Sequence, residues 1–160
     1  MGKLTAAVRV ADEVWIATAL LHREHPQAAD FSVKEIVVRL EREGLTDRAR
    51  PGVNPHLSSQ AVANRRPDPG RYRMLVATPA GRRRLFRPGD PYDAGREGGK
   101  THPNRDDVPP KYHRLIDWYE REWVAARESD PLLEIGDRYR SLWKDVNADA
   151  YVRRLREGWK

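Results

Sequence analysis

Polar side chains able to read DNA bases gather in one short segment of the chain. Asparagine and glutamine form paired hydrogen bonds with adenine, arginine does so with guanine, and serine bonds to either. The ordinary alternative is a solvated helix face, but arginines follow this segment closely and favour a contact with nucleic acid. The predicted DNA-binding residues are Ser58, Ser59, Gln60, Asn64, Arg65, Arg66, Arg71, Arg73, Arg82, Arg83 and Arg84.

Positive charge is concentrated in the middle of the chain. The whole chain carries a net charge of +6, whereas residues 48–105 hold 13 basic and 4 acidic residues. The excess in this stretch is therefore larger than that of the full chain. Nearly all of these cations are arginine, whose planar fork matches phosphate and guanine edges. We expect double-stranded DNA as a partner, with binding that weakens as salt rises.

Composition excludes several other classes of protein. With no cysteine, the chain has no disulfide, thiolate zinc site or cysteine nucleophile, and a reducing, cytoplasmic location is expected. No apolar run reaches the roughly 18 residues of a spanning helix, so no membrane partner is expected. His22 and His25 are three residues apart, but the sequence offers no third ligand for a metal.

Two segments invite an enzymatic interpretation and do not support it. Residues 98–101 read Gly-Gly-Lys-Thr, yet Ala94 stands where a phosphate-binding P-loop requires glycine. Ser58 and Ser59 lack the Gly-x-Ser-x-Gly elbow of a hydrolase nucleophile. We therefore expect a protein that is not an enzyme and that needs no cofactor or metal.

Two helices are expected in the first third of the chain. Apolar residues recur at helical spacing over residues 11–25. The second helix is marked more clearly: Ser32 and Glu35 match a capping box, Phe31 precedes it as a hydrophobic staple, and Gly44 ends it.

The next elements predict an α+β fold, a winged helix-turn-helix. Residues 55–64 read as a third helix, and residues 72–78 and 85–86 as two strands around a turn at residues 79–81. Three helices followed by a β-hairpin is the order of this fold. Arg82 to Arg84 then lie on the wing, where phosphate contacts orient a protein on DNA.

The domain organisation follows from these elements. We assign residues 1–10 to an N-terminal segment, 11–88 to the winged helix, 89–111 to an irregular linker, 112–127 to an amphipathic helix and 128–160 to a tail. The helix carries an apolar stripe that we expect to be core: Tyr112, Leu115, Ile116, Tyr119 and Trp123.

Three motifs of the tail resemble the C-terminal toxin-binding segment of VapB-type antitoxins from type II toxin–antitoxin systems. They are Asp-Pro-Leu-Leu at 130–133, Leu-Trp-Lys-Asp at 142–145, and the run from Ala148 to Trp159. The resemblance implies that the front of the chain binds operator DNA and the tail wraps a PIN-domain ribonuclease. It points to these toxin-binding residues: Leu132, Leu133, Tyr139, Leu142, Trp143, Tyr151, Val152, Arg153, Arg154, Leu155, Arg156 and Trp159.

The resemblance also implies a way to inhibit the toxin. PIN nucleases hold magnesium with carboxylates, and Arg153, Arg154 or Arg156 can fork onto those carboxylates and displace the metal. The front departs from the family, since most relatives use a ribbon-helix-helix or AbrB-like module. Residues 56–75 are instead similar to an uncharacterised bacterial winged-helix family, through His-Leu-Ser-Ser, Val-Ala-Asn and Tyr-Arg-Met-Leu. A homodimer or a toxin–antitoxin hetero-oligomer is expected.

Other interpretations stay open. The chain is an independent winged-helix transcriptional regulator if the tail serves for dimerisation. The tail can also be a helical cap on the protein's own core. It is an accessory of a nuclease or modification system if it binds nucleic acid and regulates nothing. An adjacent short acidic PIN-type reading frame favours the antitoxin.

Overall fold

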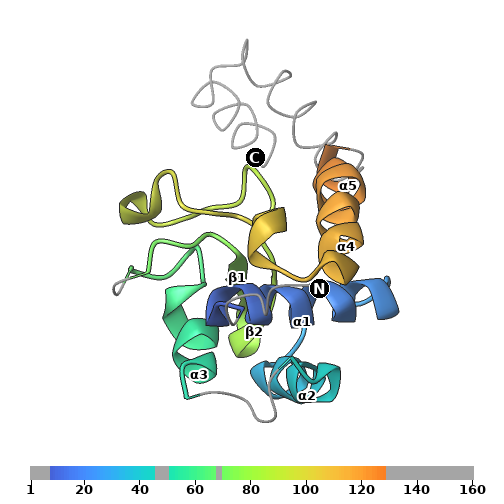
Figure 1. Ribbon diagram of the computed structural model, residues 1–160. Helices are drawn as coiled ribbons and strands as arrows, with labels where there is room; N and C mark the ends of the chain where they lie inside the picture. The colour runs from blue at the N-terminus through green and yellow to red at the C-terminus, as the bar shows by residue number, and fades with distance from the viewer. Residues whose placement is uncertain (1–7, 46–50, 68–69, 129–160) are drawn as a thin grey trace, which may run out of the picture. The chain divides into compact units, whose positions relative to one another are not determined.

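The computed structural model describes residues 8–45, 51–67 and 70–128 and has an α+β architecture (Figure 1). The chain divides after Arg121 into a main unit and a second unit, of which residues 122–128 are described. Among the described residues, no helix is both long and apolar enough to cross a membrane.

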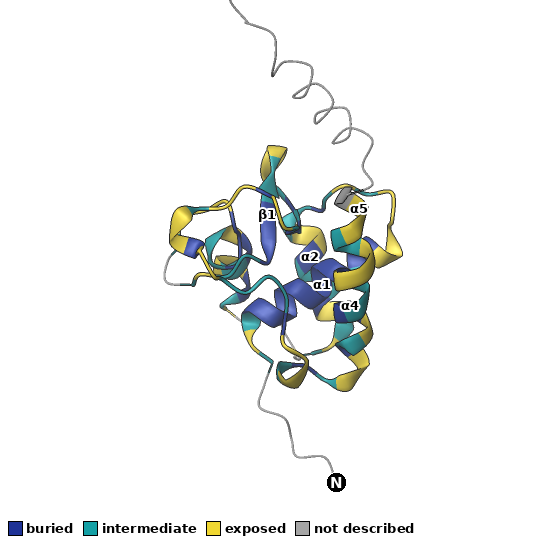
Figure 2. Cartoon of the chain, turned by 90° about the horizontal axis from the view of Figure 1, so that it is seen from above, coloured by how far each residue is buried: buried dark blue, intermediate teal, exposed yellow. Residues whose placement is uncertain are grey.

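Helix α1, Val10–Glu24, lies at the centre of the main unit, and Figure 2 shows most of its length buried. Val14, Trp15 and Ile16 are wholly buried, because apolar residues cover more than one face of this helix. It packs against α2, Val33–Glu43, which buries the narrower stripe expected of a surface helix.

The predicted capping box at the start of α2 is confirmed. The hydroxyl of Ser32 accepts a hydrogen bond from the Glu35 N–H at 3.1 Å, and the Glu35 carboxylate accepts one from the Ser32 N–H at 2.6 Å. Gly44 ends the helix in the left-handed region with φ of 71°, which glycine adopts without steric cost.

The third helix is shorter at its C-terminal end than the sequence predicts. It runs through α3, Val53–Pro55, and a π-helical turn, His56–Gln60, although the prediction extended it to residue 64. The reason is a competing partner: the Ala63 N–H donates to Leu75 O at 2.7 Å, and the Leu75 N–H donates to Ala61 O at 2.9 Å. Residues 61–64 therefore run alongside a strand instead of continuing the helix.

That strand, β1 (Leu75–Thr78), pairs antiparallel with β2 (Arg82–Leu85) around a turn at Pro79–Gly81. Leu75 lies opposite Leu85, and Thr78 lies opposite Arg82. The second strand begins at Arg82, before the predicted Leu85, and it contains the arginine triplet that the sequence places on the turn and the return strand. Its side chains consequently alternate between the two faces of the hairpin.

Phe31, just before α2, forms an isolated antiparallel bridge with this hairpin. Its N–H and C=O both bond to the backbone of Arg83, each at 2.8 Å. The bridge thus ties the connection between α1 and α2 to the returning strand.

The segment predicted as an irregular linker is part of the main unit and contains three short 3₁₀ turns, Ala94–Arg96, Arg105–Asp107 and Pro110–Tyr112. The Arg73 N–H donates to Lys100 O at 2.8 Å, which holds this segment beside the strand entering the hairpin.

Helix α4 (His113–Trp118) is followed by a π-helical turn (Tyr119–Trp123), and the second unit contains α5 (Val124–Glu128). Tyr119 packs edge-on against Trp15 with ring centroids 5.6 Å apart, and its hydroxyl donates to Phe86 O at 2.5 Å. The predicted core role of four stripe residues is confirmed by their burial: Tyr112, Leu115, Ile116 and Tyr119.

Candidate nucleic-acid interface

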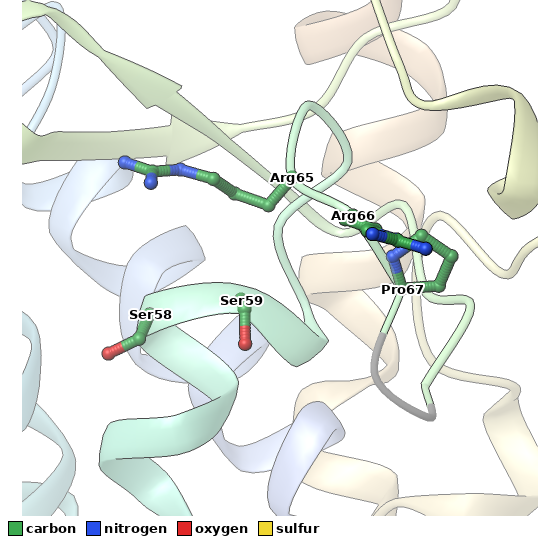
Figure 3. A pocket seen from close by; sticks show the side chains of 5 residues that line it. All are labelled: Ser58, Ser59, Arg65, Arg66 and Pro67. Carbon is green, nitrogen blue, oxygen red and sulfur yellow. The ribbon is translucent and has the colours of Figure 1, made fainter.

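A surface pocket of about 620 Å³ brings together five residues from the end of the third helix and the loop after it (Figure 3). They are Ser58, Ser59, Arg65, Arg66 and Pro67. The π-helical turn presents the two serines, and the turn at residues 61–64 leads to the two arginines. Four of the predicted DNA-binding residues therefore line one pocket.

The two arginines of this pocket extend in different directions from consecutive positions (Figure 3). Both side chains are exposed, as is that of Arg71 farther along the loop. None of the three forms an ion pair with another described residue. They are accordingly free to contact separate anionic groups, such as successive phosphates of one strand.

Arg82 and Arg84 of the predicted wing are instead paired with acidic residues. Arg82 Nε lies 2.5 Å from the Asp30 carboxylate, and two nitrogens of Arg84 lie 2.7 and 2.9 Å from the Asp90 carboxylate. The hydrogen bond from Arg82, with a second one from Thr78, lowers the pKa of Asp30. Both guanidinium groups are thus already bonded to a carboxylate within the protein, Arg84 bidentately, and would have to give up that charged pair to contact a phosphate.

Arg83 is buried between these two residues. Its Nε donates to Leu57 O at 2.8 Å and its Nη1 to Arg82 O at 2.9 Å, so it joins the hairpin to the third helix. Burial, reinforced by repulsion from Arg65, lowers the pKa of the Arg83 guanidinium.

Arg73 and Asn64 also have structural partners. Arg73 Nε donates to Gly99 O at 3.1 Å, and its guanidinium carbon lies 4.6 Å from the ring centre of Tyr92. The Asn64 amide donates to Ala77 O at 2.9 Å and accepts from the Ala77 N–H at 2.8 Å. Asn64 therefore uses its amide to bond the edge of β1.

Arg96 is a functional candidate that the sequence did not single out. It stands among the basic residues of the middle stretch, but its side chain is fully buried and bonds to backbone carbonyls around the pocket. No local sequence motif indicates this role, because the carbonyl groups that accept the hydrogen bonds of Arg96 belong to a segment about 30 residues earlier in the chain.

Other predictions on the site concern residues outside the described part. All twelve predicted toxin-binding residues belong to the segment 129–160, which the structure does not describe. Within the described ranges, no group of three or more histidine or acidic side chains is placed to hold a metal ion. Comparisons with models of protein families, with curated proteins and with solved structures find no match to this chain.

Proposed function

We propose that this chain is a winged-helix protein that binds double-stranded DNA. The order of elements supports the fold: α1, α2, the short third helix, and the β1–β2 hairpin, with which Phe31 forms an isolated bridge. In helix-turn-helix proteins the helix that follows this first pair enters the major groove. Here that helix presents Ser58 and Ser59 on its exposed side.

The observation that carries the proposal is the division of the arginines. Those of the hairpin are buried or paired, whereas Arg65, Arg66 and Arg71 remain exposed, without an ion pair to a described residue, and the first two share the pocket with the serines. An unpaired arginine releases DNA counterions without first breaking a salt bridge. We assign phosphate contacts to these three residues and base contacts to the serines.

The variant Arg65→Ala/Arg66→Ala tests the assignment. Because each lost phosphate contact lowers the slope of log K against log salt by about 0.9, we expect the slope to fall by about 2. Affinity should weaken to a similar degree for duplexes of any sequence. Fluorescence anisotropy over a salt series measures both quantities.

The control is Arg23→Ala/Arg42→Ala, which removes the same charge from exposed positions outside the pocket. It should leave the slope close to that of the unmodified chain. Equal slopes for the two double variants would contradict a phosphate-binding role for the pocket.

We further propose that the protein acts as an antitoxin, repressing its own operon and neutralising a PIN-domain ribonuclease through its tail. The support is the sequence of residues 130–159, in which arginines alternate with aromatic and aliphatic side chains typical of binding hot spots. Arginines that enter the acidic active site would occupy the carboxylates that otherwise hold magnesium.

Co-expression with the toxin tests this role. The full chain should restore growth, whereas a chain ending at Ser129 and a full-length Arg153→Ala/Arg154→Ala/Arg156→Ala variant should not. The triple variant should still bind DNA, because its pocket is unchanged. Equal rescue by all three chains would remove the tail assignment. A stable homodimer with no effect on the toxin would favour an independent transcriptional regulator.

A further inference from the structure

Arg96 is a fully buried cation surrounded by backbone oxygens. Its guanidinium donates to six carbonyl groups at 2.6–3.2 Å, all of them in residues 59–72. Two of the acceptors end the third helix, and the other four follow along the loop after it. The acceptors are the carbonyl groups of Ser59, Gln60, Arg65, Arg66, Gly70 and Tyr72.

Carbonyl dipoles take the place of water around this charge. Burial lowers the pKa of Arg96, and the nearby charge of Asp93 opposes the shift without forming a hydrogen bond to the guanidinium in the described structure. A guanidinium has five N–H donors, so six acceptors use its full capacity. Losing the guanidinium would remove a donor from each of these carbonyls at once, which is costly wherever water does not replace it.

The acceptors include the backbone of the residues that line the candidate interface. Ser59, Arg65 and Arg66 each line the pocket, and the carbonyl group of each accepts a hydrogen bond from Arg96. One guanidinium thereby fixes the path of the chain from the end of the third helix to the arginine loop. The side-chain directions seen in Figure 3 depend on that path.

We infer that Arg96 is the positioning residue of the DNA interface: it holds the loop so that Arg65 and Arg66 meet their phosphates together. This role rests on the proposed function. Lysine is not an adequate substitute, because a single ammonium has three donors and cannot span acceptors arranged around a planar fork.

The test compares Arg96→Lys with Arg39→Lys, both in the full chain. Arg39 is the control, since its side chain is also largely covered but pairs with the carboxylates of Glu24 and Glu43, outside the pocket. A general loss of stability reduces the active fraction and leaves the salt slope unchanged. We expect Arg96→Lys to lower the slope by about 2, as Arg65→Ala/Arg66→Ala does, and Arg39→Lys to leave it unchanged.

A double-mutant cycle supplies a second readout. If Arg96 acts through Arg65 and Arg66, then adding Arg96→Lys to the Arg65→Ala/Arg66→Ala variant should cause little further loss of affinity. Additive losses in the cycle, or an unchanged slope in folded Arg96→Lys, would overturn the inference.

Chemical rescue covers the case in which Arg96→Lys does not fold. In Arg96→Ala, millimolar guanidinium can occupy the ring of carbonyls, and it should restore the slope more than an equal concentration of sodium chloride does. Failure of guanidinium to restore it would also overturn the inference. Absence of DNA binding by the unmodified chain would instead refute the proposed function and this role with it.

Discussion

At about pH 4.5 the free energy of unfolding should be about 2.5 kcal/mol lower than at about pH 7.5 through His22 alone. His22 is buried on α1, where its Nε2 accepts a hydrogen bond from the Leu85 N–H at 3.3 Å. Its ring also packs edge-on against Phe31 at a centroid distance of 4.9 Å. This arrangement requires a neutral imidazole.

The direction of the effect follows from the pKa of His22. Burial, followed by repulsion from Arg87 and Arg84, lowers it from 6.5 to about 3. Above pH 6.5 the ring is neutral in both the folded and the unfolded chain, so the stability is fully present. As the pH falls from there toward 3, only the unfolded chain takes up the proton, and stability falls by about 1.4 kcal/mol per pH unit.

The variant His22→Gln isolates this contribution, because glutamine keeps an acceptor for the Leu85 N–H and does not titrate. Urea unfolding at a series of pH values should show a smaller loss of stability on acidification than in the unmodified chain. The carboxylates whose pKa is lowered, such as Asp30 and Glu43, are common to both chains and cancel in the difference. His25→Gln, at an exposed position, is the control. An unchanged dependence on pH in His22→Gln would refute the assignment.

Replacing Gly99 by alanine should destabilise the protein by about 3 kcal/mol or more, at the upper end of overpacking effects. A Cβ at this position would overlap the carbonyl oxygen of Arg71 and lie 2.9 Å from that of Arg96. Backbone on both sides leaves no flexible side chain to move aside. The pairing of Arg73 with Lys100, at 2.8 Å, would have to separate.

The neighbouring glycine provides the control. Gly98 has a φ of 73°, and a Cβ added there would meet no atom within 4 Å, so Gly98→Ala should cost only the left-handed strain of about 1–2 kcal/mol. Urea unfolding of both variants measures the difference. If Gly99→Ala were no more destabilising than Gly98→Ala, the close approach of the two backbones would be refuted.

Packing contacts also account for Gly99 and Lys100 in the Gly-Gly-Lys-Thr segment, so a nucleotide-binding role is not needed to explain them. Gly99 permits close backbone packing, and the Lys100 ammonium lies 3.3 Å from the carboxylates of both Asp12 and Asp107. Burial raises the pKa of Asp12, and Lys100 opposes that shift. The lysine thus ties this segment to α1.

Local patterns predicted the helices well where the signal lies within a few residues. The capping box of Ser32 and Glu35 needs only its own turn of helix, and it formed as predicted. The predicted end of the third helix was wrong, because the backbone of residues 61–64 bonds to β1, more than ten residues away in the sequence. Hydrogen bonds between distant segments leave no periodic signal in the sequence.

The candidate site shows the same division. Clustering of arginine was visible from the amino-acid order, but the individual roles of Arg65, Arg84 and Arg96 were not. Whether an arginine is free depends on which carboxylates and carbonyls lie within a few ångströms of it. For Arg96 those partners are carbonyl groups such as those of Arg65 and Tyr72, which precede the β1–β2 hairpin in the sequence, whereas Arg96 follows it.

Composition and periodicity are local properties, and they were enough to establish the class of elements, the excess of positive charge and the stripe that packs as core. Folding then selected the cations that remain available to an anion. It buried Arg83 and Arg96 among backbone carbonyls, paired Arg82 and Arg84 with carboxylates, and left Arg65 and Arg66 exposed. This selection is invisible in the amino-acid order because a buried charge requires compensating partners, and those partners meet it only when distant segments pack together.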